Sequence, residues 1–235
     1  MWAAGADWVD VGGESTRPGA EPVSIEAELA RVLPVIEGLA AKRGPEQWIS
    51  IDTRRPAVAA AALDAGADMV NDVSGLRDPA MFDLVVSRGC AVCIMHMQGE
   101  PGNMQANPTY GDPVLEIRSK LFEVADRLVA AGHPPELICL DPGIGFGKRL
   151  AHNLALLHDA DDFRSDSNYS VLWGVSRKSM FRDLLGREAS DDRLAGTLGV
   201  AAHAMRVGTD LLRVHDVEAH ADLLDTMLAL LEAGE

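Results

Sequence analysis

Short, continuously apolar segments recur along the chain, and each is followed by polar or glycine-rich residues and then by a helical pattern. Apolar residues at successive rather than alternate positions are typical of parallel strands that are covered on both faces. The segments are residues 8–11, 48–51, 69–73, 91–95, 137–140, 171–175 and 211–214. The pattern therefore predicts seven βα units in which strand and helix alternate throughout.

Several of the intervening segments carry a signal for the start of a helix. Ser24 is expected to cap a helix in which Pro34 should cause a kink or a break. Asp78 and Asp112 each precede a proline, which is the usual order at a helix start, and the helix after Asp112 is expected to end near Gly132. Asp216 is expected to cap the last helix, which should turn these side chains inward: Val217, Ala221, Leu224, Leu228 and Leu231.

Polar side chains at the ends of the apolar segments distinguish between two parallel architectures. A doubly wound open sheet would carry a glycine-rich dinucleotide-binding sequence after its first strand, and the sequence has none there. A ring of charged and amide groups at the strand ends is instead how TIM barrels build active sites. These groups are Glu14, Arg17, Asp52, Asn71, Asp72, His96, Asp141, Lys178, Arg213 and His215. We therefore expect an α/β fold of the TIM (β/α)8 type, formed as a single domain over residues 1–235.

A closed barrel of this type has eight strands, whereas seven βα units are readable in this sequence. The chain opens on Ala3-Ala4-Gly5, which resembles the end of a helix with its terminal glycine, and then leads into segment 8–11. A helix end without its helix predicts that the first strand of the barrel is missing. Such a gap would leave two barrel edges unpaired, so we expect poor expression or aggregation.

The composition narrows the classes of partner. The net charge is −15, and a diffuse acidic surface disfavours nucleic acid and anionic membranes. The sequence contains no apolar run of membrane-spanning length and no signal-peptide pattern. Its three cysteines, Cys90, Cys93 and Cys139, are too few for a disulfide framework and indicate a cytoplasmic location. They lie in or beside apolar segments, so buried thiols are favoured over a metal site.

Two glycine-bounded loops carry candidate chemistry. Residues 12–19 (GGESTRPG) present Ser, Thr and Arg, which can bind an anion through hydroxyl donors and a bidentate guanidinium. Residues 141–148 (DPGIGFGK) follow a buried segment, and their glycines allow the backbone to approach a ligand closely. Taken singly, each loop is also compatible with an ordinary tight turn.

Seven motifs, in this order, make the chain resemble the dihydropteroate synthase family: GGESTRPGA, SIDT, NDVSG, MHMQG, DPGIGFGK, GVSRKS and RVHDV. The resemblance covers nearly the whole chain. It implies a TIM barrel that joins 6-hydroxymethyl-7,8-dihydropterin diphosphate to p-aminobenzoate, giving dihydropteroate and pyrophosphate in folate biosynthesis. It also implies a transferase reaction of the SN1 type, in which diphosphate leaves before the arylamine attacks, so no covalent nucleophile is needed.

The resemblance assigns the pterin site to five residues. Asp52, Asn71 and Asp141 would accept hydrogen bonds from the guanidine-like edge of the pterin. Lys178 would donate to the O4 and N5 side of the ring, and Arg213 would stack on the ring and reach the diphosphate. Lys178, Arg213 and Asp141 are the expected catalytic groups.

The other substrate-binding residues also follow from the resemblance. His215 would also hold the leaving diphosphate. The p-aminobenzoate subsite would use Thr16, Arg17 and Pro18 from the first loop, with Ser179 beside the catalytic lysine. The expected partners are therefore small molecules, with a homodimer as the expected assembly.

The same resemblance raises the question of a metal ion. Family members bind Mg²⁺ with the diphosphate, usually through an asparagine of a first strand and loop that this sequence does not match. No metal ligand is therefore assigned in this chain. Two alternatives stay open, namely a pterin-binding methyltetrahydrofolate methyltransferase, which would have no diphosphate to bind, and an inactive truncated relative.

Overall fold

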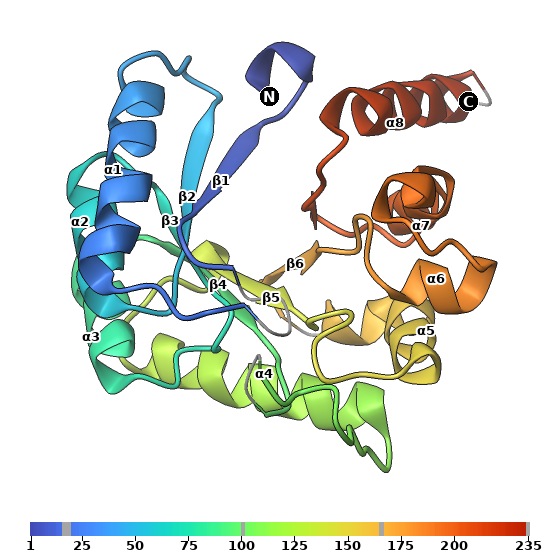
Figure 1. Cartoon of the computed structure of the whole chain (residues 1–235), viewed down its shortest axis with the longest axis horizontal. Coiled ribbons are helices and arrows are strands. Elements are labelled where there is room, and N and C mark those ends of the chain that lie inside the picture. Colours follow the sequence, from blue (N-terminus) through green and yellow to red (C-terminus); the bar gives the residue numbers. More distant parts are fainter. Residues whose placement is uncertain (16–19, 100–101, 165–166, 234–235) are drawn as a thin grey trace.

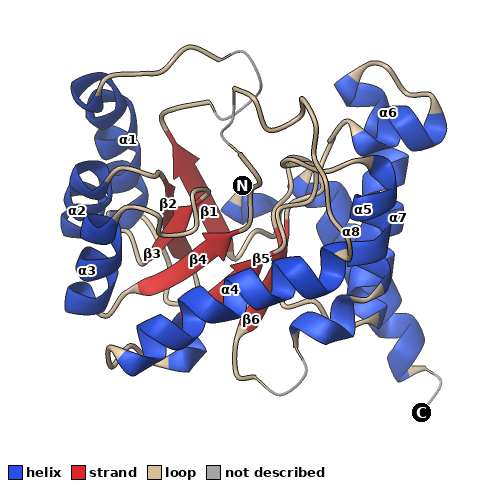
Figure 2. Cartoon of the chain, turned by 90° about the horizontal axis from the view of Figure 1, so that it is seen from below, coloured by secondary structure: helices blue, strands red, loops and turns tan. Residues whose placement is uncertain are grey.

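The computed structural model describes residues 1–15, 20–99, 102–164 and 167–233. Its centre is one sheet of seven strands, each paired in parallel with the next along the chain, in the order β1 to β7. The sheet curls, and helices cover its outer face (Figures 1 and 2). The strands are β1 Trp8–Gly12, β2 Trp48–Asp52, β3 Met69–Asp72, β4 Ala91–Met95, β5 Ile138–Asp141, β6 Ser170–Trp173 and β7 Leu211–Leu212. This arrangement confirms the predicted α/β barrel architecture with seven βα units, which stands open between β1 and β7.

The helices follow the strands in the expected alternation. They are α1 Ile25–Ala40, α2 Pro56–Asp64, α3 Pro79–Arg88, α4 Pro113–Ala130, α5 Leu150–His158, α6 Met180–Leu185, α7 Leu194–Arg206 and α8 Val217–Glu232, with short 3-10 turns η1 Trp2–Ala4, η2 Pro135–Leu137, η3 Ala160–Phe163 and η4 Ser190–Arg193. Three predicted caps are confirmed, because the side chains of Ser24, Asp78 and Asp112 accept hydrogen bonds from the first-turn amides of α1, α3 and α4. No helix in the described ranges is long and apolar enough to cross a membrane.

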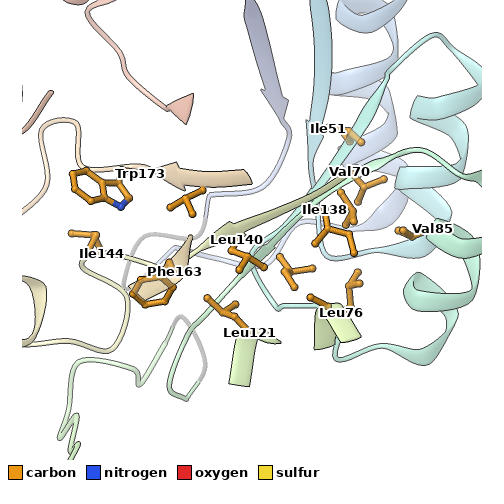
Figure 3. Close-up of a cluster of buried hydrophobic side chains, with 14 of the residues drawn as sticks. Ile51, Val70, Leu76, Val85, Leu121, Ile138, Leu140, Ile144, Phe163 and Trp173 are labelled. Atoms are coloured by element: carbon orange, nitrogen blue, oxygen red, sulfur yellow. The ribbon is translucent and has the colours of Figure 1, made fainter. Parts of the chain in front are cut away.

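The core lies mainly between the outer face of the sheet and the helices, as Figure 3 shows for Val70, Ile138, Leu140 and Trp173. These side chains are at most 1% exposed. A smaller cluster, which includes Cys93 and Cys139, is formed by alternate residues of the same strands and lies on the inner face. Burial on both faces explains why the strand sequences are apolar at successive positions.

Three local expectations were wrong in whole or in part. Strand β7 is only two residues long, although the Arg213 amide makes one further backbone bond to Trp173. The break that was one of the two outcomes expected at Pro34 is absent, because helix α1 runs from Ile25 to Ala40, and buried Val32 and Ile36 hold it against the core on both sides of the proline. Asp216 precedes α8 without a side-chain capping bond, because its carboxylate instead pairs with Arg177.

The inward face expected for α8 is also wrong at its far end. Leu228 is 50% exposed and Leu231 is 61% exposed, whereas Ala221 and Leu224 are partly buried. The physical reason is that α8 packs against α7 and the short turn η1, so its last turns extend past the elements that could cover them.

Three of the four tryptophans lie in two different surroundings. Trp8 and Trp48 are register partners at the start of β1 and β2, and their rings stack with centroids 5.7 Å apart. Trp173, at the end of β6, is fully buried and stacks on His203 of α7. One pair therefore lies at an edge of the sheet and the other ring lies in the core.

Candidate active site

Three charged side chains converge where the last strands end. Gly174 follows β6, and a Cβ atom placed on it would lie 3.8 Å from Lys178 Nζ, 3.9 Å from Arg213 Cβ and 4.0 Å from Asp141 Oδ2. Asp141 ends β5, while Lys178 and Arg213 follow β6 and β7. The structure thus brings the three expected catalytic residues together at the carboxyl ends of the strands, which is where barrel enzymes place their sites.

Asp141 is fixed by the turn that follows it. The amide of Gly143 donates to its Oδ1 atom at 2.7 Å, and the residue is only 6% exposed. Burial raises the pKa of this carboxyl, and the nearby Lys178 opposes that rise. The remaining oxygen, Oδ2, faces the space beside Gly174, where a ligand that donates hydrogen bonds could meet it.

Lys178 is held by the loop between β5 and α5. Its Nζ atom donates to the carbonyl of Ile144 and lies 4.5 Å from the centre of the Phe146 ring. Burial lowers the pKa of Lys178 to about 8, while Asp141 opposes the change. The ammonium is therefore directed by the Ile144 carbonyl and the Phe146 ring, and it feels the charge of Asp141.

The residue before Lys178 has an unusual backbone. Arg177 has φ +58°, a left-handed conformation that side chains seldom adopt. Its amide donates to Thr197 Oγ1, its carbonyl accepts from Arg193, and its guanidinium pairs with Asp216. These contacts hold the turn that directs Lys178 into the site.

Arg213 lies between two carboxylates. It donates to Asp10 of β1 and, at 3.0 Å, to Asp52 at the end of β2. Burial, followed by the charge of Asp10, raises the pKa of Asp52 to about 7, although Arg213 opposes the rise. Burial alone would lower the pKa of Arg213. The charges of Asp10 and Asp52 outweigh this effect and raise the pKa above its usual value, so the guanidinium stays charged.

Asn71 joins this arrangement and Asp72 does not. The Asn71 side-chain amide donates to Asp10 Oδ2 at 3.2 Å, so its carbonyl oxygen can accept from another group. Asp72 is fully buried and accepts from the amides of Ser74 and Leu76. Asp72 therefore shapes the turn after β3.

The remaining expected residues lie at the rim or beyond the described ranges. His215 is exposed, and its Nδ1 atom lies 2.9 Å from Ser176 Oγ. Ser179 is exposed at the start of α6. Thr16, Arg17 and Pro18 lie outside the described residues, so their expected contacts have no structural description.

The base of their loop is anchored by a network of charges. Glu14 accepts from Arg54, Arg55 and the amide of Val23. Arg55 also pairs with Glu28, which is 1% exposed. The loop therefore leaves the core from a fixed point beside the end of β2.

A cavity of about 750 Å³ opens between β1 and β7 on the inner side of the sheet. Polar side chains of the site line it, including Asp10, Asn71, Arg213 and His215. The volume lies in the range of small-molecule sites in proteins. The cavity connects the opening of the sheet with the ion pairs of Arg213.

The described residues do not fit a protein-built Mg²⁺ site. Mg²⁺ usually binds through one or two carboxylates and keeps several waters. Within the described ranges, no group of three His, Cys, Asp or Glu side chains could hold a metal. The carboxylates of Asp10 and Asp52 are both occupied by Arg213.

Comparison with known proteins shows that the chain is a member of a pterin-binding family, because the family model described as "Pterin binding enzyme" matches residues 1–215. The dihydropteroate synthase of Escherichia coli K12 is 43% identical over 235 residues, which are all of this chain and 82% of that protein. The chain therefore belongs to the dihydropteroate synthase family.

Solved structures agree in fold. Burkholderia cenocepacia dihydropteroate synthase, complexed with 7,8-dihydropteroate, has a TM-score of 0.91 at 44% identity, over 100% of this chain and 85% of that one. Xanthomonas albilineans dihydropteroate synthase, with 4-aminobenzoic acid, has a TM-score of 0.90 at 42% identity, over 98% of this chain and 81% of that one.

Sequence reasoning missed two residues of the site, Asp10 and Phe146. A carboxylate in the middle of an apolar strand was the available signal for Asp10, because such a group needs a partner when it is buried. The aromatic ring among the glycines of residues 141–148 was the signal for Phe146.

Proposed function

We propose that this chain condenses 6-hydroxymethyl-7,8-dihydropterin diphosphate with p-aminobenzoate, forming dihydropteroate and releasing pyrophosphate. The convergence of Asp141, Lys178 and Arg213 around Gly174 carries the proposal, because it sets an acceptor, a donor and a cation around one space. The relatives with bound dihydropteroate and 4-aminobenzoic acid support the choice of substrates.

Recognition of the pterin is proposed for the side of the site that is already fixed. The Oδ2 atom of Asp141 accepts from the guanidine-like edge, and Asn71 and Asp52 add acceptors from the Arg213 side of the site. Lys178 donates to the O4 and N5 side of the ring. Because Asp141 and Lys178 are held by the glycine loop, they need little rearrangement to bind a flat heterocycle.

The leaving group is proposed to depart toward Arg213 and His215. The bond between the pterin methylene carbon and the diphosphate oxygen breaks, and its electron pair goes to the diphosphate. The guanidinium and the imidazole stabilise the negative charge that develops there. The amine nitrogen of p-aminobenzoate then bonds to the methylene carbon and releases its proton to solvent.

The p-aminobenzoate subsite is proposed to lie between Ser179 and the loop that bears Thr16, Arg17 and Pro18. Ser179 is exposed immediately after Lys178, so its hydroxyl can reach a ligand beside the pterin site. The fixed base of the loop at Glu14 supports this placement.

The assembly and location of the enzyme also belong to the proposal. A homodimer is supported by apolar side chains exposed on α8, namely Leu228, Leu230 and Leu231, and light scattering tests it. A cytoplasmic location is supported by thiols that remain free in the described part of the chain.

A direct assay tests the function. The purified chain should convert the pterin diphosphate and p-aminobenzoate to dihydropteroate, measured by mass spectrometry with and without Mg²⁺. Methyltetrahydrofolate, offered instead with a thiol acceptor, should give no methyl transfer. Methyl transfer without dihydropteroate synthesis would replace the proposed reaction by the methyltransferase alternative. Absence of both activities in a folded chain would favour the inactive relative.

A further inference from the structure

One lysine of the glycine-rich loop has no part in the mechanism above. Lys148 follows the loop between β5 and α5, and it is only 4% exposed. Its Nζ atom lies 2.9 Å from the carbonyl oxygens of Gly143 and Phe146, and 3.2 Å from the carbonyl oxygen and the Nδ1 atom of His96. All four acceptors are uncharged groups of the protein.

Burying the Lys148 ammonium among uncharged acceptors costs free energy. A buried ammonium without a bound carboxylate loses its hydration and regains only dipole contacts. Burial accordingly lowers the pKa of Lys148 to about 7, although Asp141 opposes the change. An apolar side chain of similar length would fill the same space without this desolvation cost. Packing alone therefore does not explain a lysine at this position.

The contacts of Lys148 join two pieces of backbone that touch directly. Gly143 and Gly147 have φ +67° and +59°, and a Cβ atom on them would lie 1.9 Å from His96 O and 2.6 Å from Gln98 O. The glycine loop therefore rests on the chain that leaves β4, with no side chain between them. Lys148 closes this contact because it bonds to the loop and to His96 at the same time.

The same loop holds the catalytic side chains. The amide of Gly143 binds Asp141, while the carbonyl of Ile144 and the ring of Phe146 hold the ammonium of Lys178. Gly143 and Phe146, which stand before and after the pair Ile144 and Gly145, are tied to the end of β4 by the bonds of Lys148. A shift of the loop would thus move an acceptor and a donor of the site together.

We infer that Lys148 is a positioning residue, which holds the glycine loop on the end of β4 and so directs Asp141 and Lys178 toward the substrate. The inference rests on the proposed function for its catalytic consequence. It also predicts the tautomer of His96: the Nδ1 atom lies 3.2 Å from the Lys148 ammonium, which cannot accept a hydrogen bond, so the ring proton is expected on Nε2. Burial, followed by the charge of Lys148, lowers the pKa of His96 to about 3, which keeps the ring neutral.

The first test measures kinetics in two matched variants. Lys148→Met removes the donors and keeps an unbranched side chain, and Lys42→Met makes the same change at an exposed position. Per folded molecule, Lys148→Met should lower kcat by about tenfold or more, with a smaller rise in KM, and Lys42→Met should change neither. Lys148→Arg, which keeps the charge and the donors, should restore part of the loss.

Unchanged kcat in folded Lys148→Met, even with a lowered melting temperature, would overturn the inference, since that is the result of a purely structural role. If Lys148→Met does not fold, the wild-type chain still decides. Its His96 ring, followed by 15N NMR and assigned with His96→Gln, should stay neutral with the proton on Nε2 at about pH 5 to 6, where Lys148, with a pKa of about 7, is an ammonium. A proton on Nδ1, or a charged ring in this range, would overturn the inference. A wild-type chain that lacks synthase activity but shows this tautomer would count against the proposed function alone.

Discussion

The two sides of the candidate site are built in different ways. On the β5–β6 side, Asp141 and Lys178 are held by backbone groups of a glycine loop that is buried against β4. On the β7–β1 side, Arg213 follows a strand of two residues, its side chain is 44% exposed, and it is held by the carboxylates of Asp10 and Asp52.

This difference corresponds to the two parts of the proposed pterin substrate. A flat, neutral ring is recognised best by donors and acceptors that are already in place. A diphosphate that must bind and then leave is served by a cation whose ion pairs can be exchanged. Arg213 can pass from the carboxylates to the incoming diphosphate. Asp52, with its pKa near neutrality, can then take up a proton when Arg213 leaves it.

The largest effect is expected on the fixed side. Asp141→Ala should cost about 2–4 kcal/mol in transition-state binding, because a buried acceptor of the pterin edge is lost. The fold should survive, since the substitution removes the bond from the Gly143 amide to the Asp141 carboxylate and leaves the backbone bonds of β5 in place. Steady-state kinetics and calorimetry with the pterin measure the loss. Unchanged pterin affinity would remove Asp141 from the recognition site.

A smaller and more selective effect is expected on the open side. Arg213→Ala should weaken binding of the pterin diphosphate by about 1.5–3 kcal/mol, and should weaken binding of a pterin without diphosphate much less. Lys178→Ala is the matched control, because its target is the ring and both ligands should lose affinity. Calorimetry with both ligands separates these cases. Equal losses in Arg213→Ala would mean that the guanidinium only stacks on the ring.

The smallest effect concerns stability and pH. The pKa of Asp52 is about 7 in the folded chain against 3.8 for an ordinary aspartate, so between these values the folded state binds more protons than the unfolded state. Wild-type stability should therefore fall as pH rises from about 4 to 7, and Asp52→Asn should lack this contribution. As pH rises from about 4 to 7, Asp52→Asn should gain roughly 1–2 kcal/mol relative to wild type, less than the full shift implies because the titration of Asp52 is shared with its neighbour Asp10.

Urea unfolding of both proteins at several pH values measures this difference. A pH-independent difference would show that Arg213 already neutralises Asp52 in the folded chain. The open side would then resemble the fixed side, and the contrast between the two would be lost.

Much of the fold could be predicted because its signals are local. Continuous apolar segments identify parallel strands, and the caps at Ser24, Asp78 and Asp112 depend on residues within one turn. The failures depended on distant partners. The Asp216 carboxylate does not cap α8 because it pairs with Arg177, which lies 39 residues earlier in the chain. The exposure of the outer leucines of α8 depends on which elements pack beside them.

The site shows the same division. Asp141, Lys178 and Arg213 could be located because they lie in motifs that follow apolar segments. Asp10 could not be assigned, because its importance comes from Arg213, a residue 203 positions away. The bonds of Lys148 to His96 likewise span 52 positions and became visible only when β4 and the glycine loop were placed together.

The placement of the tryptophans has a spectroscopic consequence. The stacked indoles of Trp8 and Trp48 lie at the edge of the sheet and should give a coupled circular-dichroism band. The indole of Trp173 is fully buried on His203 and should emit at short wavelength. Fraying of β1 would abolish the first signal while the second persists, so the open edge and the core can be followed separately in one unlabelled sample.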